Sequence, residues 1–268
     1  MSIITISRGS YSKGKEVAEK VAERLGYSCI SRDVLVEASE QFNIPEIKLI
    51  RALHDSPSIL DRFTYGKERY LAYIESTLLE QARKDNIVYH GLAGHFILRA
   101  VKHVLKVRIL ANIEDRVALE AKRENISKEE ARHLLKKDDH ERRQWSLSLF
   151  GVDTWDPSLY DLVIHVHQIS VDDAVDIICH TAALEHFKNT AESQKALEDL
   201  ALAARTKAAL ISVVPNVTVT ALDGKVYIEA KGDLSQEAGM ISELKDLAKE
   251  VPGVKEIAVH ISPPTLYG

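Results

Sequence analysis

Glycine and lysine recur near the start of the chain at a spacing that suits the binding of phosphate groups. An apolar run at residues 3–6 leads into Gly9-Ser10-Tyr11-Ser12-Lys13-Gly14-Lys15-Glu16, and a helical pattern follows at once. A loop between a strand and a helix points backbone N–H groups and a helix N-terminus inward, where they can hold a phosphate chain. Lys15 would then reach the terminal phosphates, although Glu16 stands where this loop usually has Ser or Thr. A plain strand-to-helix turn with a basic helix start is the alternative.

Basic side chains are concentrated in a second, helical stretch at residues 113–145. They are Arg116, Lys122, Arg123, Arg132, Lys136, Lys137, Arg142 and Arg143. A phosphotransferase needs such cations to close over phosphates and neutralise the charge that develops in the transition state. Arginine suits this role because its planar guanidinium binds two phosphate oxygens at once. Acidic residues are interleaved with these cations, so a solvated helix face with ion pairs between successive turns is the alternative interpretation.

Other polar residues fall where an α/β sheet presents its binding edge. Asp33 follows the second predicted strand, His90 and Gly91 follow a buried strand at residues 87–89, and Arg69 begins a long helix. Ordinary helix-start, loop and surface roles are the alternatives for these residues. His90 and His95 are five residues apart with glycines between them, and no cysteine is near. This spacing is not that of a metal-binding pair on a helix, and we expect no metal held by protein side chains alone.

Composition excludes several classes of protein. The formal net charge of the 268 residues is −5, which provides no overall basic field for nucleic acid. Two cysteines, Cys29 and Cys179, make no disulfide framework and fit a reducing compartment. The first residues do not form a signal peptide, and no apolar stretch approaches the roughly 20 residues that span a bilayer. We therefore expect a cytoplasmic protein without a transmembrane segment.

Strands and helices alternate in the first part of the chain, which predicts a parallel sheet covered by helices. The predicted strands lie at residues 3–6, 27–30, 87–89, 105–111 and 162–166. The predicted helices lie at residues 15–25, 33–42, 47–54, 65–84, 113–145 (with a break at Asn125) and 170–186. A polar stretch at 187–194 marks a domain boundary. Beyond it we expect a helix at 196–210, a hairpin of strands 217–222 and 226–230 around Asp223-Gly224, a helix at 235–251 and a strand at 254–261.

Several pieces of the first part match a known family in their order along the chain. They are Ile-Thr-Ile-Ser-Arg at residues 4–8, Gly14-Lys15-Glu16-Val17-Ala18, Leu25-Gly26-Tyr27, Asp33, Ala93-Gly94-His95-Phe96-Ile97-Leu98, Val107-Arg108-Ile109, Glu114-Asp115-Arg116, Asp139-His140-Glu141-Arg142 and residues 156–164. In this order they resemble the cytidylate kinase-like proteins of the P-loop nucleoside monophosphate kinase superfamily. The resemblance implies a P-loop kinase domain at residues 1–187 with a lid at about 113–145, and ATP with Mg²⁺ as the phosphate donor.

The tail resembles a BON domain over residues 195–262, and Pro252-Gly253-Val254-Lys255-Glu256-Ile257 fits the closing turn of that domain. The resemblance implies a ligand, a lipid surface or a protein as the partner of the tail. The expected fold class is therefore α/β: a P-loop kinase-type parallel sheet flanked by helices, followed by a small α+β domain of order α-β-β-α-β.

The family resemblance also implies roles for individual residues, with nucleotides as substrates. The implied catalytic residues are Lys15, Arg116, Arg123 and Arg142. The residues implied to bind the donor are Gly9, Ser10, Ser12, Lys13, Gly14, Lys15, Glu16 and Arg143. Those implied to bind the acceptor are Arg8, Asp33, Arg69, His90 and Gly91. On this interpretation a Lys15→Ala variant folds but loses turnover. The identity of the acceptor and the oligomeric state stay open.

The chain departs from the family at Leu92, where an arginine usually meets the phosphate of the substrate. Losing such a contact weakens monophosphate binding by about 1.5–3 kcal/mol. The loop also carries Tyr11 and Lys13 where the family has small residues, and bulky side chains restrict the approach of backbone to phosphate. A non-catalytic nucleotide sensor, in which the tail reports to a partner, is therefore a second hypothesis. A scaffold that binds no nucleotide is a third.

Overall fold

A computed structural model describes residues 2–9, 12–31, 65–91 and 93–263 of the chain. The two helices predicted at 33–42 and 47–54 lie outside the described residues, as do Ser10, Tyr11, Asp33 and Leu92.

Five parallel strands form the central sheet, as the alternating pattern predicted. They are β1 (Ile3–Arg8), β2 (Ser28–Ile30), β3 (Ile87–His90), β4 (Val104–Ala111) and β5 (Leu162–Val166). Their order in the sheet is β2-β3-β1-β4-β5, and Ile3 of the central strand is in register with Ile87 and Val104. The parallel arrangement places the C-terminal ends of β1 and β4 side by side at one edge of the sheet, where α/β proteins bind ligands.

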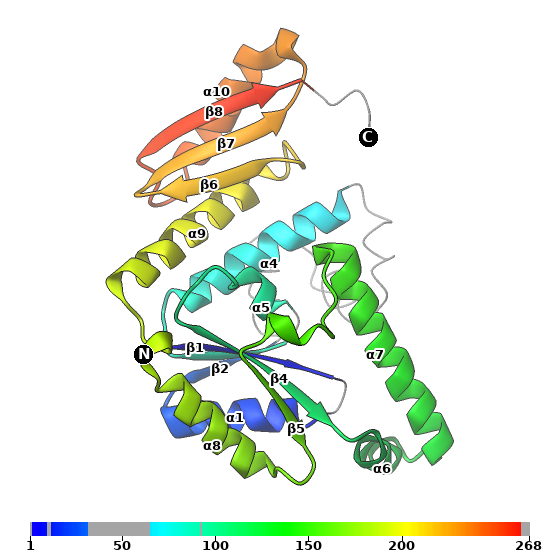
Figure 1. The fold of residues 1–268 in the computed structure, drawn as a ribbon. Coiled ribbons are helices and arrows are strands. Elements are labelled where there is room, and N and C mark those ends of the chain that lie inside the picture. Colours follow the sequence, from blue (N-terminus) through cyan, green and yellow to red (C-terminus); the bar gives the residue numbers. More distant parts are fainter. Residues whose placement is uncertain (1, 10–11, 32–64, 92, 264–268) are drawn as a thin grey trace.

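Helices cover both faces of this sheet (Figure 1). On one face lie α1 (Gly14–Leu25) and α8 (Val171–Ala182), and on the other α4 (Gly66–Ala82), α5 (Gly94–Ile97) and α9 (Ala191–Leu210). The first pair buries Val17, Val21 and Ile178 against the strands. Burying side chains of this size contributes about 1.5–3 kcal/mol each, so the two helices are fixed to the sheet chiefly by their apolar faces.

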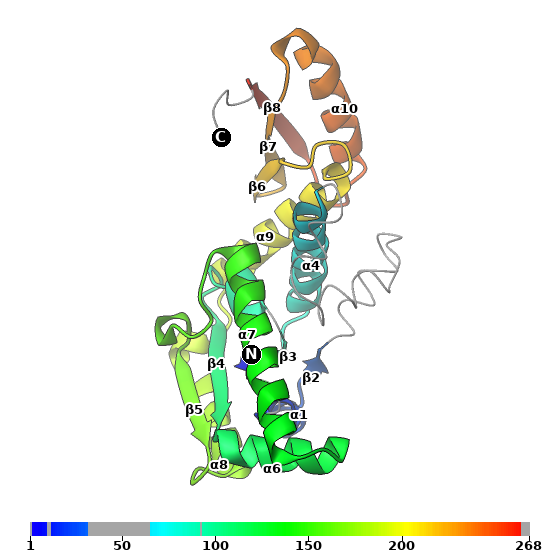
Figure 2. The same ribbon diagram turned by 90° about the vertical axis from the view of Figure 1, so that its right-hand side faces the viewer.

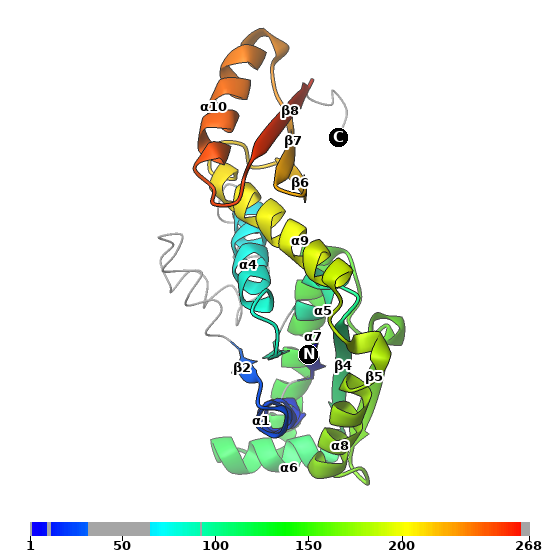
Figure 3. The ribbon, with the colours of Figure 1, turned by 90° about the vertical axis from the view of Figure 1, so that its left-hand side faces the viewer.

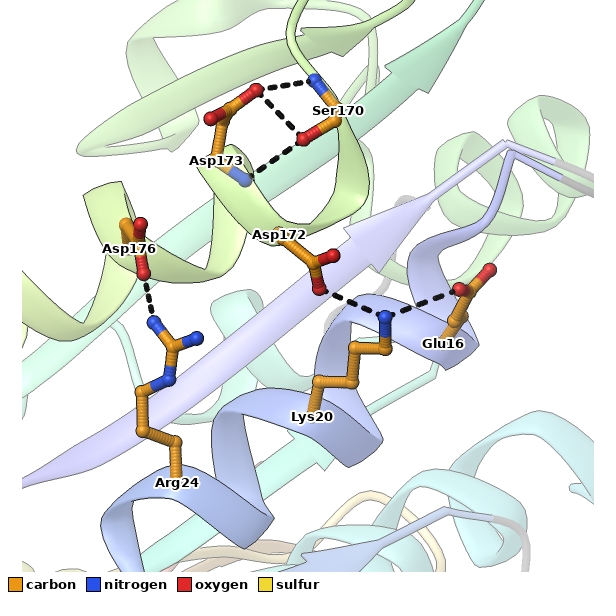
Figure 4. A network of polar contacts seen from close by, with 7 residues as sticks. All are labelled: Glu16, Lys20, Arg24, Ser170, Asp172, Asp173 and Asp176. Atoms are coloured by element: carbon orange, nitrogen blue, oxygen red, sulfur yellow. Dashed lines mark hydrogen bonds and ion pairs between the residues drawn. The ribbon is translucent and has the colours of Figure 1, made fainter.

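Ion pairs on the surface join α1 to α8 (Figure 4). Nζ of Lys20 lies 2.8 Å from Oδ1 of Asp172 and 3.6 Å from Oε1 of Glu16, and Arg24 pairs with Asp176. Ser170 caps α8 by accepting from the backbone N–H of Asp173. Exposed pairs contribute little stability each, so their effect is to set the relative orientation of two helices that the core already holds.

A helical hairpin of α6 (Ile113–Glu124) and α7 (Lys128–Phe150) lies beyond the strand ends (Figure 2). The predicted break at Asn125 is confirmed: this residue has φ 55°, the left-handed conformation in which asparagine commonly ends a helix. The predicted capping box is confirmed as well, because Ser127 accepts from the N–H of Glu130 and Glu130 accepts from the N–H of Ser127. The two helices pack through a small apolar cluster around Val117 and Leu135.

The C-terminal part has the predicted order α-β-β-α-β, with α9 followed by a three-stranded mixed sheet and α10. Its elements are β6 (Thr218–Leu222), β7 (Lys225–Lys231), α10 (Glu237–Lys249) and β8 (Glu256–Ser262). Strands β6 and β7 are antiparallel and β7 and β8 parallel. Asp223 and Gly224 both have positive φ, at 55° and 87°, as a tight hairpin turn requires.

Helix α9 takes part in the cores of both sheets (Figure 3). Leu197 and Ala201 are fully buried beside Ile3 and Leu98 in the core of the parallel sheet. From the next residue onward, Leu202, Ala208 and Leu210 pack in the core of the C-terminal sheet, together with Ala72 and Tyr73 of α4. The helix begins at Ala191, inside the polar stretch that the sequence marks as a boundary, and it connects the two sheets through shared apolar side chains.

Candidate active site

A cavity of about 350 Å³ opens where the C-terminal ends of β1 and β4 face α6 and α7. We call it the arginine cavity. It is lined by Ser7, Arg8, Gly9, Arg108, Leu110, Arg116, Asp139, Arg142, Thr154 and Trp155. Four guanidinium groups and one carboxylate among these residues give it a strongly positive character, which attracts and holds anions such as phosphates.

The register of the sheet brings two strand residues to this cavity. Ser7 of β1 is paired with Arg108 of β4, and Arg8 with Ile109. Because the two strands are parallel neighbours, the last residues of β1 lie beside Arg108 and Ile109, two to three residues before the end of β4. The first turn of α6, which follows β4 directly, adds Arg116, and the middle of α7 adds Asp139 and Arg142.

Arg116 is fixed by Asp139 across the α6–α7 hairpin. Its Nη2 donates to Oδ1 and Oδ2 of Asp139 at 3.0 and 2.8 Å, and only 8% of the arginine is exposed. The pair stands close to the start of the glycine loop, since a Cβ built on Gly9 would lie 3.6 Å from Oδ1 of Asp139 and 3.8 Å from Nη1 of Arg116. A phosphate at Gly9 would therefore meet a guanidinium that is already oriented.

The described part of the glycine loop is held by Ser12 and shaped by glycine. The buried Oγ of Ser12 donates to the carbonyls of Gly9 at 3.0 Å and Ile109 at 3.2 Å. A Cβ on Gly14 would lie 2.7 Å from Cβ and 2.8 Å from Cδ of Arg8, a distance that real Cβ atoms do not show. Gly14 therefore lets the side chain of Arg8 pass directly over the first turn of α1.

The predicted catalytic lysine points elsewhere. Lys15 is 64% exposed, and its Nζ lies 3.6 Å from Oε1 of Glu19, one turn further along α1. It does not line the arginine cavity. Lys13, with φ 63° at the N-cap of α1, and Glu16 instead line a second cavity of about 650 Å³.

This second cavity, which we call the α1–α6 cavity, lies between α1, α6 and the start of α8. It is lined by Lys13, Glu16, Lys20, Ala111, Asp115, Arg116, Ala118, Leu119, Val166, His167, Ser170, Val171 and Asp172. Arg116 lines both cavities, and it is the residue that their linings share.

The remaining predicted site residues lie outside both cavities. Arg123 binds Glu120 at 2.8 Å and Glu124 at 3.0 Å, and burial raises the pKa of Glu120. Arg143 binds Asp153 at 2.5 Å. Arg69 is exposed on α4. The structure thus brings Arg8, Gly9, Arg116 and Arg142 of the predicted set together in the arginine cavity, and Lys13 and Glu16 in the α1–α6 cavity.

The end of β3 contributes two further predicted residues that line neither cavity. His90 is buried at the last position of the strand. Gly91 makes room for an aromatic ring, because a Cβ at this position would lie 2.9 Å from the hydroxyl of Tyr89. Both residues are packed against the sheet in this structure.

A buried polar network below the arginine cavity was not found from the sequence. Arg108 donates to the carbonyl of Thr154 and, at 3.1 Å, to the hydroxyl of Tyr160. That hydroxyl lies 3.3 Å from both Ser7 Oγ and His95 Nε2. Burial, reinforced by the charge of Arg108, lowers the pKa of His95 to about 3, so this imidazole is neutral. The signal in the sequence was Arg108, a charged residue between the apolar residues Val107 and Ile109 of the predicted strand.

The described residues hold no group of three or more His, Cys, Asp or Glu side chains arranged to bind a metal ion. Asp139 is the carboxylate that lines the arginine cavity.

None of the helices in the described part of the chain is both long and apolar enough to span a membrane.

A parallel sheet of order β2-β3-β1-β4-β5, a glycine loop after its first strand and a helical hairpin over the strand ends define a P-loop kinase fold. The profile of the cytidylate kinase-like family matches residues 3–168. The chain belongs to the cytidylate kinase-like family.

Individual relatives agree with this assignment. The chain is 31% identical to the cytidylate kinase of Archaeoglobus fulgidus over 192 residues, which cover 69% of this chain and 97% of that protein. It is 29% identical to the cytidylate kinase of Pyrococcus horikoshii over 188 residues, or 69% of this chain and 88% of that protein. The crystal structure of an uncharacterized protein from Eubacterium ventriosum matches 68% of this chain and 98% of its own, with a TM-score of 0.52 and 21% identity, and shows the same fold.

Proposed function

We propose that this chain is an ATP-dependent phosphotransferase whose acceptor is a nucleoside monophosphate. The observation that carries the proposal is that Arg116 lines both cavities. Transfer between two bound nucleotides requires two adjacent binding spaces and a cation where they join, because the catalysis consists mainly of positioning and charge neutralisation. The similarity to proteins named cytidylate kinase supports the same reaction class.

In this proposal the acceptor phosphate lies in the arginine cavity, and the base of ATP in the α1–α6 cavity. Arg8, Arg116 and Arg142 would neutralise the transferring phosphoryl group. Asp139 keeps Arg116 in place before substrate arrives, so little reorganisation is needed during the reaction. Lys15 would contribute only through rotation away from Glu19.

A Mg²⁺ ion would have to arrive with the nucleotide, because the arginine cavity is lined by four arginines and by one carboxylate, Asp139, whose two oxygens both accept from Arg116. Mg²⁺ usually keeps several waters and binds through phosphate oxygens together with one or two carboxylates, and Asp139 would be available to it only by leaving Arg116. When bound, the ion would offset the charge of the phosphates. Glu16 lies on the α1–α6 cavity and is paired with Lys20 at 3.6 Å.

The test is the release of ADP from MgATP with each nucleoside monophosphate as acceptor, for the wild-type chain and for two arginine variants. Arg142→Ala removes a cation from the arginine cavity, and we expect turnover to fall by about 100-fold or more, as for other lost transition-state contacts. Arg132→Ala is the matched control, since Arg132 belongs to the same helix and pairs with Glu114 at 2.6 Å on the surface. Equal turnover in both variants would contradict the proposal.

The second candidate function is a nucleotide sensor without turnover, in which the BON-like C-terminal part contacts a ligand, a lipid surface or a protein. The observation that favours it is the exposed position of Lys15 beside Glu19, together with Glu16 after it. Saturable ATP binding that depends on Arg116, with no ADP release for any acceptor, would favour this function. The shared helix α9 gives such a signal a direct route between the two sheets.

A further inference from the structure

Trp155 is a large aromatic side chain at the rim of the arginine cavity. It lines that cavity, yet 56% of it is exposed, so it is not part of a core. The other tryptophan of the chain, Trp145, is buried and makes an edge-to-face contact with Tyr70. An indole ring left at the mouth of a cationic cavity is placed to contact a ligand rather than to stabilise the fold.

The backbone and ring of Trp155 are held in place by neighbouring charges. The side chain of Asp153 accepts from the N–H of Trp155 at 3.0 Å and from Nε of Arg143 at 3.0 Å. This contact with Arg143 lowers the pKa of Asp153, which stays ionised. Cζ of Arg143 lies 4.4 Å from the centroid of the indole ring. A guanidinium against the ring is a favourable cation–π contact, and it orients the ring before a ligand binds.

Thr154, the residue before Trp155, is also held in place by hydrogen bonds. The carbonyl of Thr154 accepts from Arg108 and, at 3.0 Å, from the hydroxyl of Tyr160, both of them buried. The segment that carries Trp155 is therefore attached to α7 through Arg143 and to the middle of β4 through Arg108. Binding residues held by such supporting contacts lose little conformational entropy when a ligand arrives.

We propose that Trp155 forms the platform on which the base of the acceptor nucleotide stacks, while Arg8, Arg108 and Arg142 of the same cavity face its phosphate. This inference rests on the proposed function and adds to it the feature of the acceptor that is recognised: a planar ring attached to an anionic group. A base stacks on an aromatic face without sequence-specific hydrogen bonds, so Trp155 contributes affinity more than choice among bases.

The position of Trp155 assigns it to the acceptor and not to ATP. It shares the arginine cavity with Arg8 and Arg142 and does not line the α1–α6 cavity. Arg116 is the residue that both linings share, so a base stacked on Trp155 would occupy a different cavity from the one proposed for the donor base.

The test is isothermal titration calorimetry of the full chain with the nucleoside monophosphates, with ribose 5-phosphate and with ATP. For Trp155→Ala we expect the affinity for a nucleoside monophosphate to fall by about 5- to 150-fold, the range measured for lost base stacking. Ribose 5-phosphate lacks the base, so it should bind the wild-type chain and Trp155→Ala with the same affinity. ATP should also bind these two proteins with the same affinity. Trp155→Phe keeps an aromatic face and should restore most of the affinity.

Two results would overturn the inference. The first is an unchanged affinity of Trp155→Ala for a nucleoside monophosphate. The second is an equal loss of affinity for ribose 5-phosphate, which would indicate a general disturbance of the cavity. ADP release separates this inference from the proposed function. Turnover combined with an unchanged affinity in Trp155→Ala leaves the phosphotransferase standing and removes the role of Trp155. A base-dependent loss of affinity without any turnover supports the stacking platform and contradicts the phosphotransferase.

Discussion

At the scale of single residues, Arg8 and Gly14 depend on each other at the start of α1. The arginine side chain passes over Gly14 and enters the arginine cavity, whereas Lys15 lies on the outer surface of the helix. A guanidinium inside a partly enclosed cavity makes charge-assisted contacts with phosphate that an exposed ammonium does not. We therefore propose that Arg8 has the part in phosphate binding that the sequence pattern gives to Lys15.

We expect Arg8→Ala to reduce ADP formation more than Lys15→Ala does. Loss of one charge-assisted contact to phosphate corresponds to about 1.5–3 kcal/mol, or roughly a 10- to 150-fold fall in kcat/KM. Lys15→Ala removes an exposed pair with Glu19, and we expect a change below about 5-fold. Steady-state kinetics of both variants makes the comparison, and a larger effect of Lys15→Ala would show that the lysine turns inward when nucleotide binds.

His95 makes the stability of the protein depend on pH. Its pKa is lowered to about 3 by burial first and by Arg108 second, against about 6.5 in the unfolded chain. Between these values the unfolded state takes up a proton that the folded state does not, so the free energy of unfolding falls as the pH falls below 6.5.

The titration of His95 alone lowers the free energy of unfolding by about 2 kcal/mol between pH 7.5 and pH 5. His95→Gln keeps a polar atom near the hydroxyl of Tyr160 but does not titrate, and we expect it to remove that part of the pH dependence. Denaturant unfolding of both proteins across this range measures the difference. Parallel stability curves would mean that His95 is accessible to protons in the folded state.

At the scale of elements, two glycines with open space around them have opposite conformational roles. Neither Gly239 in the first turn of α10 nor Gly26 at the C-cap of α1 has an atom within 4 Å of a built Cβ. Gly26 has φ 67°, where a side chain is strained, whereas Gly239 adopts helical backbone. An added Cβ would therefore clash with no neighbouring residue at either position, and the two glycines differ only in their backbone conformation.

We expect Gly239→Ala to stabilise the protein by about 0.5–1 kcal/mol, because alanine restricts the unfolded chain and suits a helix. Gly26→Ala should destabilise it by about 1–2 kcal/mol, the cost of a left-handed residue with a Cβ. Chemical denaturation of the two variants gives both values. A Gly26→Ala variant at least as stable as the wild-type chain would refute the left-handed conformation at Gly26, and a destabilised Gly239→Ala variant would contradict the prediction for Gly239.

Much of this element structure was predictable because local chemistry determines it. Asn125 ends α6, Ser127 begins α7, and the pair Asp223-Gly224 closes the hairpin, each through a backbone conformation or a cap that its own side chain favours. The parallel sheet followed from apolar runs alternating with helical patterns.

The site was less predictable because its contacts cross between distant elements. Arg116 and Asp139 meet through the fold of a hairpin, and Arg108 meets Tyr160 from another strand end, 52 residues away. Lys13, at the N-cap of α1, has a left-handed backbone with φ 63°, which no pattern of residue types marks. Spacing identified the loop and the arginine-rich helices, but it did not determine which of their cations share a cavity.

At the scale of the whole molecule, α9 couples the parallel sheet to the C-terminal sheet. Leu197 has no exposed surface in the first core, and Leu210 has none in the second. A helix that contributes to two cores cannot leave one of them without exposing side chains of the other. We therefore expect the described domains to unfold in one cooperative transition, and differential scanning calorimetry to record a single peak.

Leu197→Ala tests this coupling directly. Replacing a fully buried leucine by alanine costs about 2–5 kcal/mol through lost burial and the cavity left behind. The damage lies in the core of the parallel sheet, yet we expect the C-terminal sheet to melt at the same lowered temperature, because both depend on the position of α9. A calorimetric trace with two separate peaks, only one of them shifted, would show that the sheets unfold independently.

The same argument predicts which truncated chains fold. A chain of residues 1–187 lacks α9 and leaves the apolar surface around Ile3, Leu98 and Val104 open to water. We expect it to lose cooperative unfolding, since the side chains of α9 that complete this core are gone. A chain of residues 1–211 keeps α9 and should unfold cooperatively, although Ala208 and Leu210 become exposed. Thermal unfolding followed by circular dichroism compares the two. A stable, cooperative 1–187 chain would mean that the kinase fold needs no contribution from α9, and that the helix serves the C-terminal sheet alone.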